Sequence, residues 1–171
     1  MFRKNIFQVL PGENTLYFSV NYLKLLLQKA ETKSNMKKVT GIGGVFFKCD
    51  DPNAMNEWYA KNLGIDAGEY GATFEWRQAD NPSVKGSTAW STFPKDSQYF
   101  NPSTKPFMIN YRVANLSELL VELVREGVNV IDEIAEFEYG KFLHILDPEG
   151  NVIELWEPKP DYVWDEKENS R

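Results

Sequence analysis

The sequence predicts an α+β fold in which one pattern, strand–helix–strand–strand–strand, occurs twice at an offset of roughly 64 residues. Two observations carry this prediction. A run of β-branched and aromatic residues opens each half, and a helix with recognisable start and stop signals follows each run. Few residues are identical between the halves, so the repeat is one of architecture. Neither half is large enough to bury a core alone, and we expect the two to pair edge to edge.

The first half contains three predicted strands and one predicted helix. These are strands Ile42–Cys49, Ala72–Gln78 and Ser87–Phe93, and helix Ala54–Asn62. Asp51 is a typical N-cap residue and Pro52 suits the first helical position. Gly64 stands where a glycine in the left-handed conformation commonly ends a helix.

The second half repeats this order after a polar connector, residues 94–106, that contains three prolines. Its predicted elements are strands Phe107–Val113, Val128–Ile131, Phe142–Leu146 and Val152–Trp156, and a helix through Leu119, Leu120, Leu123 and Val124. Asn115 or Ser117 caps this helix, and Gly127 closes it. Residues 147–150, Asp-Pro-Glu-Gly, predict a tight turn between the last two strands.

We expect residues 36–160 to form one domain, with modules at about 38–97 and 103–160. The first 35 residues, with an amphipathic helix predicted over Leu16–Lys29, are separated from this domain by a polar linker. We expect this N-terminal extension to be dispensable. Residues 161–171 form an acidic tail.

Composition limits the partners that the chain can have. Its 171 residues carry a net charge of -6 with a pI of about 4.9, and no face rich in Lys and Arg is predicted, so we expect no nucleic-acid partner. The single cysteine, Cys49, excludes an intramolecular disulfide and a cysteine-based metal site. No apolar run is long enough to cross a membrane, and we expect a soluble, cytoplasmic protein without a membrane partner.

Residues 147–158, DPEGNVIELWEP, resemble the C-terminal signature of the vicinal oxygen chelate superfamily. That superfamily includes glyoxalase I, bleomycin-resistance proteins, fosfomycin-resistance transferases and extradiol dioxygenases. The resemblance covers about residues 38–158. It implies two βαβββ modules whose curved mixed sheets enclose a cleft, commonly completed in a homodimer, so we expect a homodimer.

The resemblance also implies where a metal would bind. Superfamily enzymes hold a divalent metal through His, Glu or Gln side chains on the first and last strands of each module, and the matching positions here are Gly44, Trp90, Met108 and Glu154. Only Glu154 offers a ligand for Mg²⁺, Ni²⁺ or Zn²⁺. We predict no metal and no other cofactor, and a metal held partly by Glu154 is the alternative.

The one histidine of the chain is predicted to lie beside Glu154. Pairing outward from the turn at 147–150 places His144 directly opposite Glu154 in the last hairpin. By the resemblance Glu154 faces the cleft, so His144 is expected there as well. Two interpretations stay open: a polar pair that satisfies itself and shapes the pocket, or a catalytic acid–base pair.

Alternation along the strands, together with the resemblance, predicts the ligand-binding residues of the cleft. They are Phe46, Lys48, Trp90, Met108, Asn110, Arg112 and Trp156. Aromatic side chains around a few polar groups are typical of a small-molecule site. We therefore predict a protein that binds a small organic molecule without the metal site of the family. The alternative is a superfamily enzyme, of the lyase, isomerase or dioxygenase type, that uses His144 and Glu154 or a metal.

Overall fold

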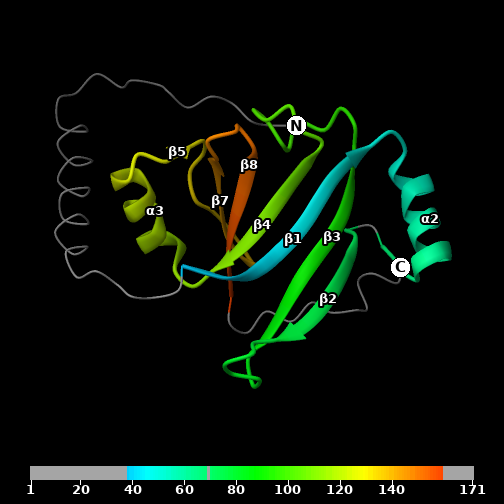
Figure 1. Ribbon diagram of the computed structural model, residues 1–171, viewed down its shortest axis with the longest axis horizontal. Helices are drawn as coiled ribbons and strands as arrows, with labels where there is room; N and C mark the ends of the chain where they lie inside the picture. Colours follow the sequence, from blue (N-terminus) through cyan, green and yellow to red (C-terminus); the bar gives the residue numbers. More distant parts are fainter. Residues whose placement is uncertain (1–37, 69, 160–171) are drawn as a thin grey trace. The chain divides into compact units, whose positions relative to one another are not determined.

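The computed structural model describes residues 38–68 and 70–159, which form an eight-stranded sheet with two helices (Figure 1). The first module consists of β1 (Val39–Cys49), α2 (Pro52–Leu63), β2 (Ala72–Arg77) and β3 (Lys85–Pro94). The second module consists of β4 (Phe107–Val113), α3 (Leu116–Arg125), β5 (Asn129–Val130), β6 (Ala135–Phe137), β7 (Gly140–Leu146) and β8 (Val152–Pro158).

The order of strands in the sheet, β2-β3-β1-β4-β8-β7-β5, shows how the modules join. Each module has one parallel pair, β1 with β3 and β4 with β8, and β1 pairs antiparallel with β4 at the middle of the sheet. The short β6 lies off this path and pairs with β7. The predicted α+β fold with a mixed sheet is confirmed. The repeat is less regular than predicted, because the described part of the first module has three strands instead of four and the second module has five.

Local sequence signals account for both helices. The Asp51 side chain accepts a hydrogen bond from the Ala54 amide at 3.0 Å, and Gly64 ends α2 with φ of 70°. For α3 the cap is Asn115, whose side chain accepts from the Glu118 amide at 3.1 Å. The alternative cap at Ser117 is thereby wrong, because Ser117 lies inside the helix.

The two helices, which lie at opposite ends of the sheet in Figure 1, contribute unequally to the core. Helix α3 buries Leu116 and Leu119 against Val113, Leu143 and Leu155 of the sheet. By contrast, no residue of α2 is buried. The larger apolar cluster therefore lies between α3 and the strands of the second module.

The β7–β8 hairpin has the register that the sequence predicts. The Asp147 backbone amide donates a hydrogen bond to the Asn151 carbonyl across the turn, and Gly150 has a φ of 76°. Hydrogen bonds from the side chain and backbone of Asn151 hold the pKa of Asp147 below its usual range. As a result His144 is paired directly with Glu154.

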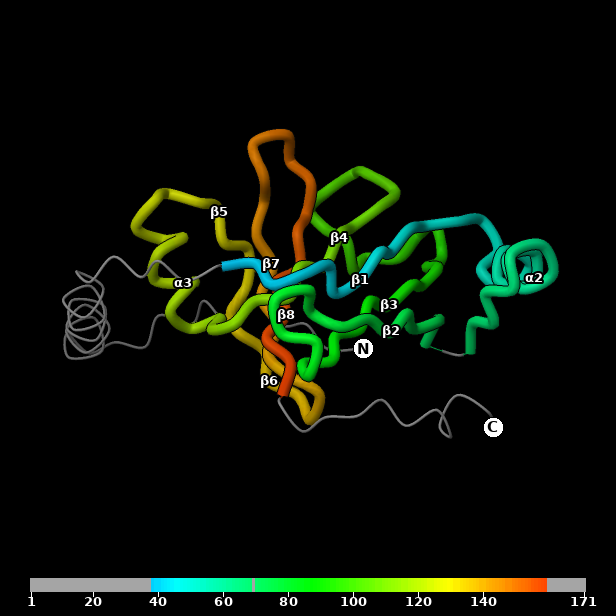
Figure 2. The backbone as a smooth tube through the Cα atoms, turned by 60° about the horizontal axis from the view of Figure 1, so that its bottom comes forward, coloured from blue at the N-terminus to red at the C-terminus, as the bar shows by residue number. Residues whose placement is uncertain are grey.

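The connector between β3 and β4 departs from the expectation of a purely polar segment. Phe100 is completely buried and forms an apolar cluster with Met108 and Val152. In Figure 2 the connector, in green, and the β7–β8 turn, in orange, project from the same side of the sheet. The connector is therefore part of the core. The sequence also gave no indication of the three-residue strand β6.

Several expectations concern residues that lie outside the described ranges. These are the N-terminal extension 1–35 with its helix at Leu16–Lys29, and the acidic tail 161–171. Neither helix of the described ranges has the length and apolar character that crossing a membrane requires.

Replacing Phe100 with Ala tests whether the connector belongs to the core. Because the ring is fully buried, we expect F100A to lower the free energy of unfolding by roughly 3–5 kcal/mol. Phe107→Ala, at a ring that is 42% exposed, is the matched control and should cost far less. Urea titration measures both values, and equal losses in the two variants would contradict the assignment.

Candidate functional site

Three neighbouring strands bring together a cluster of buried polar side chains. Asn110 on β4 is paired with Glu154 on β8, and Glu154 is paired with His144 on β7. Asn110 and Glu154 are each 2% exposed and His144 is 6% exposed. A carboxylate at this depth is tolerated only where other groups replace its hydration.

Three side chains supply that replacement for Glu154. Its Oε1 atom lies 2.9 Å from His144 Nε2 and also accepts a short hydrogen bond from the Tyr99 hydroxyl. Its Oε2 atom accepts from the Asn110 amide at 2.5 Å. Both oxygens of the carboxylate are therefore occupied by protein groups.

A second carboxylate lies on the other side of His144. Asp132 Oδ2 is 2.6 Å from Nδ1 of the ring, and Asp132 Oδ1 accepts from the His144 backbone amide at 2.7 Å. Burial alone would lower the pKa of His144, but the hydrogen bonds and charges of Asp132 and Glu154 outweigh it and raise the pKa to about 9. At neutral pH the ring is an imidazolium held between two carboxylates.

Two members of this cluster, Tyr99 and Asp132, were not predicted from the sequence. The aromatic pair Tyr99-Phe100 in an otherwise polar connector was the available signal for the first. Asp132 has no comparable signal. Asp132 reaches the histidine because the segment before it lies beside β7, where the Ile131 amide donates a hydrogen bond to the His144 carbonyl at 3.0 Å.

Beside this cluster, the guanidinium of Arg112 packs against two indole rings. Its Cζ atom is 5.6 Å from the centre of the Trp76 ring and 4.9 Å from that of Trp156. Phe142 extends the column, because its ring stacks on Trp156 at 6.0 Å. Burial lowers the pKa of Arg112, although an arginine keeps its charge at any pH of interest.

Glycines make room for this column. A Cβ atom at Gly41 or Gly86 would lie 2.7 or 2.3 Å from the Trp76 ring, so a side chain at either position would displace the indole. A Cβ atom at Gly43 would lie 2.0 Å from Asn110 Oδ1. The glycines of β1 therefore serve close packing across the sheet.

Two buried polar atoms at the junction of cluster and column, Asn110 Oδ1 and Arg112 Nε, form no hydrogen bond within the part of the chain that the structure describes. The guanidinium has one weak contact, from Nη1 to Ser87 Oγ at 3.5 Å, and no acidic side chain of the described residues forms an ion pair with it. Groups of this kind are uncommon in folded proteins and call for a partner.

The seven predicted ligand-binding residues do not form one site. Asn110, Arg112 and Trp156 lie together beside His144 and Glu154, as described above. Met108 is fully buried in the apolar cluster with Phe100 and Val152, and Phe46 packs against that cluster. Phe46 and Met108 are thus placed as core residues.

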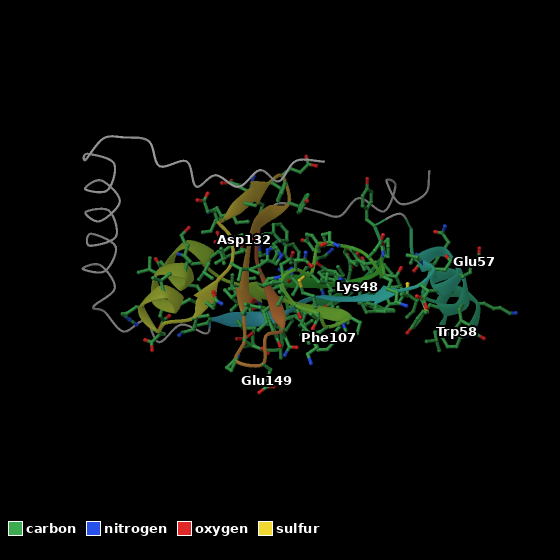
Figure 3. All side chains as sticks on the ribbon, turned by 90° about the horizontal axis from the view of Figure 1, so that it is seen from above. Lys48, Glu57, Trp58, Phe107, Asp132 and Glu149 are labelled. Carbon is green, nitrogen blue, oxygen red and sulfur yellow. The ribbon has the colours of Figure 1, made fainter. Side chains whose placement is uncertain are left out.

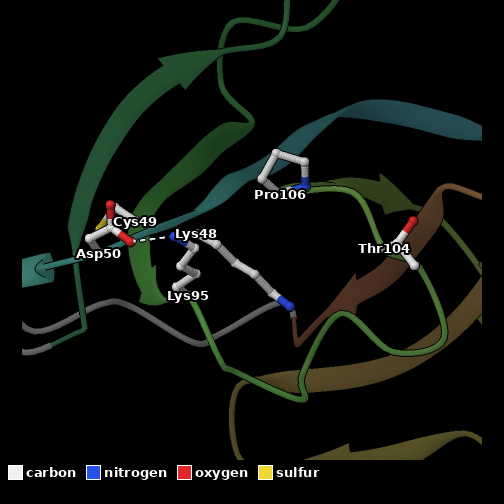
Figure 4. A pocket seen from close by; sticks show the side chains of 6 residues that line it. All are labelled: Lys48, Cys49, Asp50, Lys95, Thr104 and Pro106. Carbon is white, nitrogen blue, oxygen red and sulfur yellow. Dashed lines mark hydrogen bonds and ion pairs between the residues drawn. The ribbon is translucent and has the colours of Figure 1, made fainter.

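Lys48 lies elsewhere, near the end of β1. It lines a surface pocket with Cys49, Asp50, Lys95, Thr104 and Pro106 (Figure 4). Figure 3 shows Lys48 towards the α2 end of the sheet and Asp132 towards the α3 end. Its ammonium lies 5.1 Å from the centre of the Phe100 ring.

The prediction that Trp90 shares the face of Phe46 is wrong. The Trp90 ring packs 4.6 Å from Tyr59 of α2 and 5.4 Å from Phe47, on the face that the helix covers. The reason is the parallel register of β1 and β3, which pairs Val45 with Trp90 and Phe46 with Ser91. Paired residues point to the same side of a sheet, so Trp90 follows Val45.

The residues at the four positions where the resemblance implied metal ligands do not form a metal site. The space above Gly44 is taken by the Phe46 ring, Trp90 lies on the helix face, and Met108 is enclosed by apolar side chains. The carboxylate of Glu154 is occupied by Tyr99, His144 and Asn110. Within residues 38–68 and 70–159 there is no group of three acidic, His or Cys side chains suited to a metal ion.

The fold is similar to that of solved methylmalonyl-CoA epimerases. The methylmalonyl-CoA epimerase of Mycobacterium tuberculosis aligns with 77% of this chain and 96% of its own, at 21% identity and a TM-score of 0.50. A variant of the Streptomyces coelicolor methylmalonyl-CoA epimerase, in complex with 2-nitronate-propionyl-CoA, aligns with 74% of this chain and 99% of its own, at 17% identity and a TM-score of 0.54.

The similarity is one of structure. No protein-family model matches the chain, and no curated protein matches it in sequence. At these identities the solved structures establish the fold, and the chemistry has to be argued from the residues present.

The raised pKa of His144 predicts how stability changes with pH. Between pH 6.5 and about 9 the folded chain keeps a proton on His144 that the unfolded chain has lost. The free energy of unfolding should therefore fall as the pH rises through this window, by on the order of 3 kcal/mol in total.

Urea titrations at pH 6.5, 7.5, 8.5 and 9.5 measure this dependence, and His144→Gln is the control variant. We expect the pH-dependent decrease to disappear in H144Q, whatever the variant's own stability. A decrease of the same size in both proteins would assign the effect to other groups.

Proposed function

We propose that the chain binds a small organic molecule beside Asn110, Arg112 and Trp156, and that the His144–Glu154 pair maintains this site without exchanging protons with the ligand. The proposal separates two adjacent groups of residues that the sequence had placed in one cleft. The His144 and Glu154 side chains are fully hydrogen-bonded by protein groups, whereas one atom each of Asn110 and Arg112 has no hydrogen bond within the described ranges.

The contrast in hydrogen bonding is the observation that supports the proposal. Every polar atom of the Glu154 carboxylate and of the His144 ring is bound by a protein group. Among the described residues, the buried atoms Asn110 Oδ1 and Arg112 Nε have none. An unpaired polar atom in a buried position costs roughly 1–3 kcal/mol, and a bound ligand would recover that cost.

Acid–base catalysis, the second candidate, needs Glu154 or His144 to reach a substrate. The observation in its favour is that Tyr99, which donates to Glu154, is 38% exposed, so one movable side chain separates the carboxylate from the surface. Against it, an imidazolium between two carboxylates is a poor proton acceptor below pH 9. The geometry supports binding better.

A thermal-shift screen of small organic molecules tests the proposal when it is run on matched variants. Arg112→Met and Lys48→Met each remove one positive charge, the first at the proposed site and the second at the pocket of Figure 4. We expect molecules that stabilise the wild type and K48M, and that bind R112M roughly 10- to 100-fold more weakly.

Two results would contradict the proposal. Molecules that lose affinity in K48M while retaining it in R112M would place the site at the surface pocket. A molecule that the wild type converts to a product, and that E154Q binds without converting, would establish the catalytic alternative.

A further inference from the structure

We infer that the ligand carries a carboxylate with a single negative charge, bound by the edge of the Arg112 guanidinium. This inference rests on the proposed function, because it names the chemical class of the molecule bound at that site. It depends on the charge, the orientation and the surroundings of one side chain.

No acidic side chain of the described residues compensates the charge of Arg112. By contrast, the buried His144 ring lies between two carboxylates. Arg112 has only the Ser87 hydroxyl at 3.5 Å, and no acidic side chain within residues 38–68 and 70–159 forms an ion pair with it. Holding a cation partly out of water without an anion is unfavourable, and an anionic ligand removes that cost.

The contacts of Arg112 leave N–H groups available to an anion. The guanidinium packs against the Trp76 and Trp156 rings, and its Nε atom has no hydrogen bond from the described residues. Two parallel N–H donors in the plane of a guanidinium match the two oxygens of a carboxylate. The contacts with both indoles also restrict the side chain before the ligand arrives, which reduces the entropy lost on binding.

The neighbouring cluster favours one negative charge over two. With His144 protonated, Asp132, His144 and Glu154 together carry a charge of -1, and Asn110 links Glu154 to the strand of Arg112. A phosphate monoester, with nearly two negative charges, would be repelled more strongly by this cluster than a carboxylate. A carboxylate therefore fits the local balance of charge best.

The probes for this inference are acetate, benzoate and cyclohexanecarboxylate, each paired with its uncharged amide. The readout is the Nε–Hε signal of Arg112 in ¹H–¹⁵N spectra of the full chain, assigned by its absence from Arg112→Gln. We expect at least one carboxylate to shift this signal in a saturable manner, with its amide binding at least roughly 10-fold more weakly. Lys48→Gln, which removes a charge elsewhere, should leave that affinity nearly unchanged.

The outcomes separate this inference from the proposed function. If acids and amides shift the signal equally, or if phenyl phosphate binds more tightly than benzoate, the inference is wrong while binding at Arg112 stands. If none of the carboxylates shifts the signal, but a neutral molecule from the thermal screen does, the conclusion is the same. If no molecule from either experiment depends on Arg112, the proposed function fails.

R112Q lacks the observed signal and could lose binding through altered folding. The affinity of each carboxylate for R112Q and for Ser87→Ala, which retains the guanidinium, is therefore also measured by thermal shift. We expect S87A to keep the affinity within about threefold, since the contact that it removes is 3.5 Å long. A loss as large as that in R112Q would attribute the effect to general disturbance of the site and overturn the inference.

Discussion

The burial of the Glu154 carboxylate is the constraint on which the rest of the site depends. An anion that is 2% exposed requires partners for both oxygens, and β4, β7 and the connector each supply one. Asp132 then balances the charge of the histidine that faces Glu154. Two adjacent residues hold the connector against the sheet. Tyr99 does so through the hydrogen bond of its hydroxyl to Glu154, and Phe100 through its buried ring. Removing any one partner would leave a buried charge without a compensating hydrogen bond, and the desolvation penalty would lower the free energy of unfolding.

The same network determines what is left for a ligand. Because the Nδ2 atom of Asn110 is committed to Glu154, its Oδ1 atom is directed to Gly43, and only a glycine leaves space for it there. Two positions further along β4, Arg112 packs against Trp156 of the adjacent β8 and against Trp76 of β2. The fold is shared with methylmalonyl-CoA epimerases, and the four positions at which the resemblance of the sequence implied metal ligands hold a glycine, an indole, a thioether and an occupied carboxylate.

Local sequence signals were sufficient to predict most of the fold and the His144–Glu154 pair of the site. The turn at 147–150 determines the register of the last hairpin, and the pairing of His144 with Glu154 followed from it. The position of Trp90 did not follow, because the register of a parallel pair is set by the packing of the intervening helix and strand rather than by a turn. Tyr99 and Asp132 were missed for a related reason: both reach the site from irregular segments, where no periodicity relates a residue to a face of the sheet.

The central claim is that His144 is an imidazolium held between two carboxylates, and one measurement addresses it directly. Since the chain contains a single histidine, ¹⁵N labelling of histidine gives one pair of ring-nitrogen signals without further assignment. At pH 8, below the pKa of about 9, both nitrogens should show the chemical shifts of protonated imidazolium. The shifts of a neutral tautomer at that pH, with one protonated and one bare nitrogen, would contradict the account.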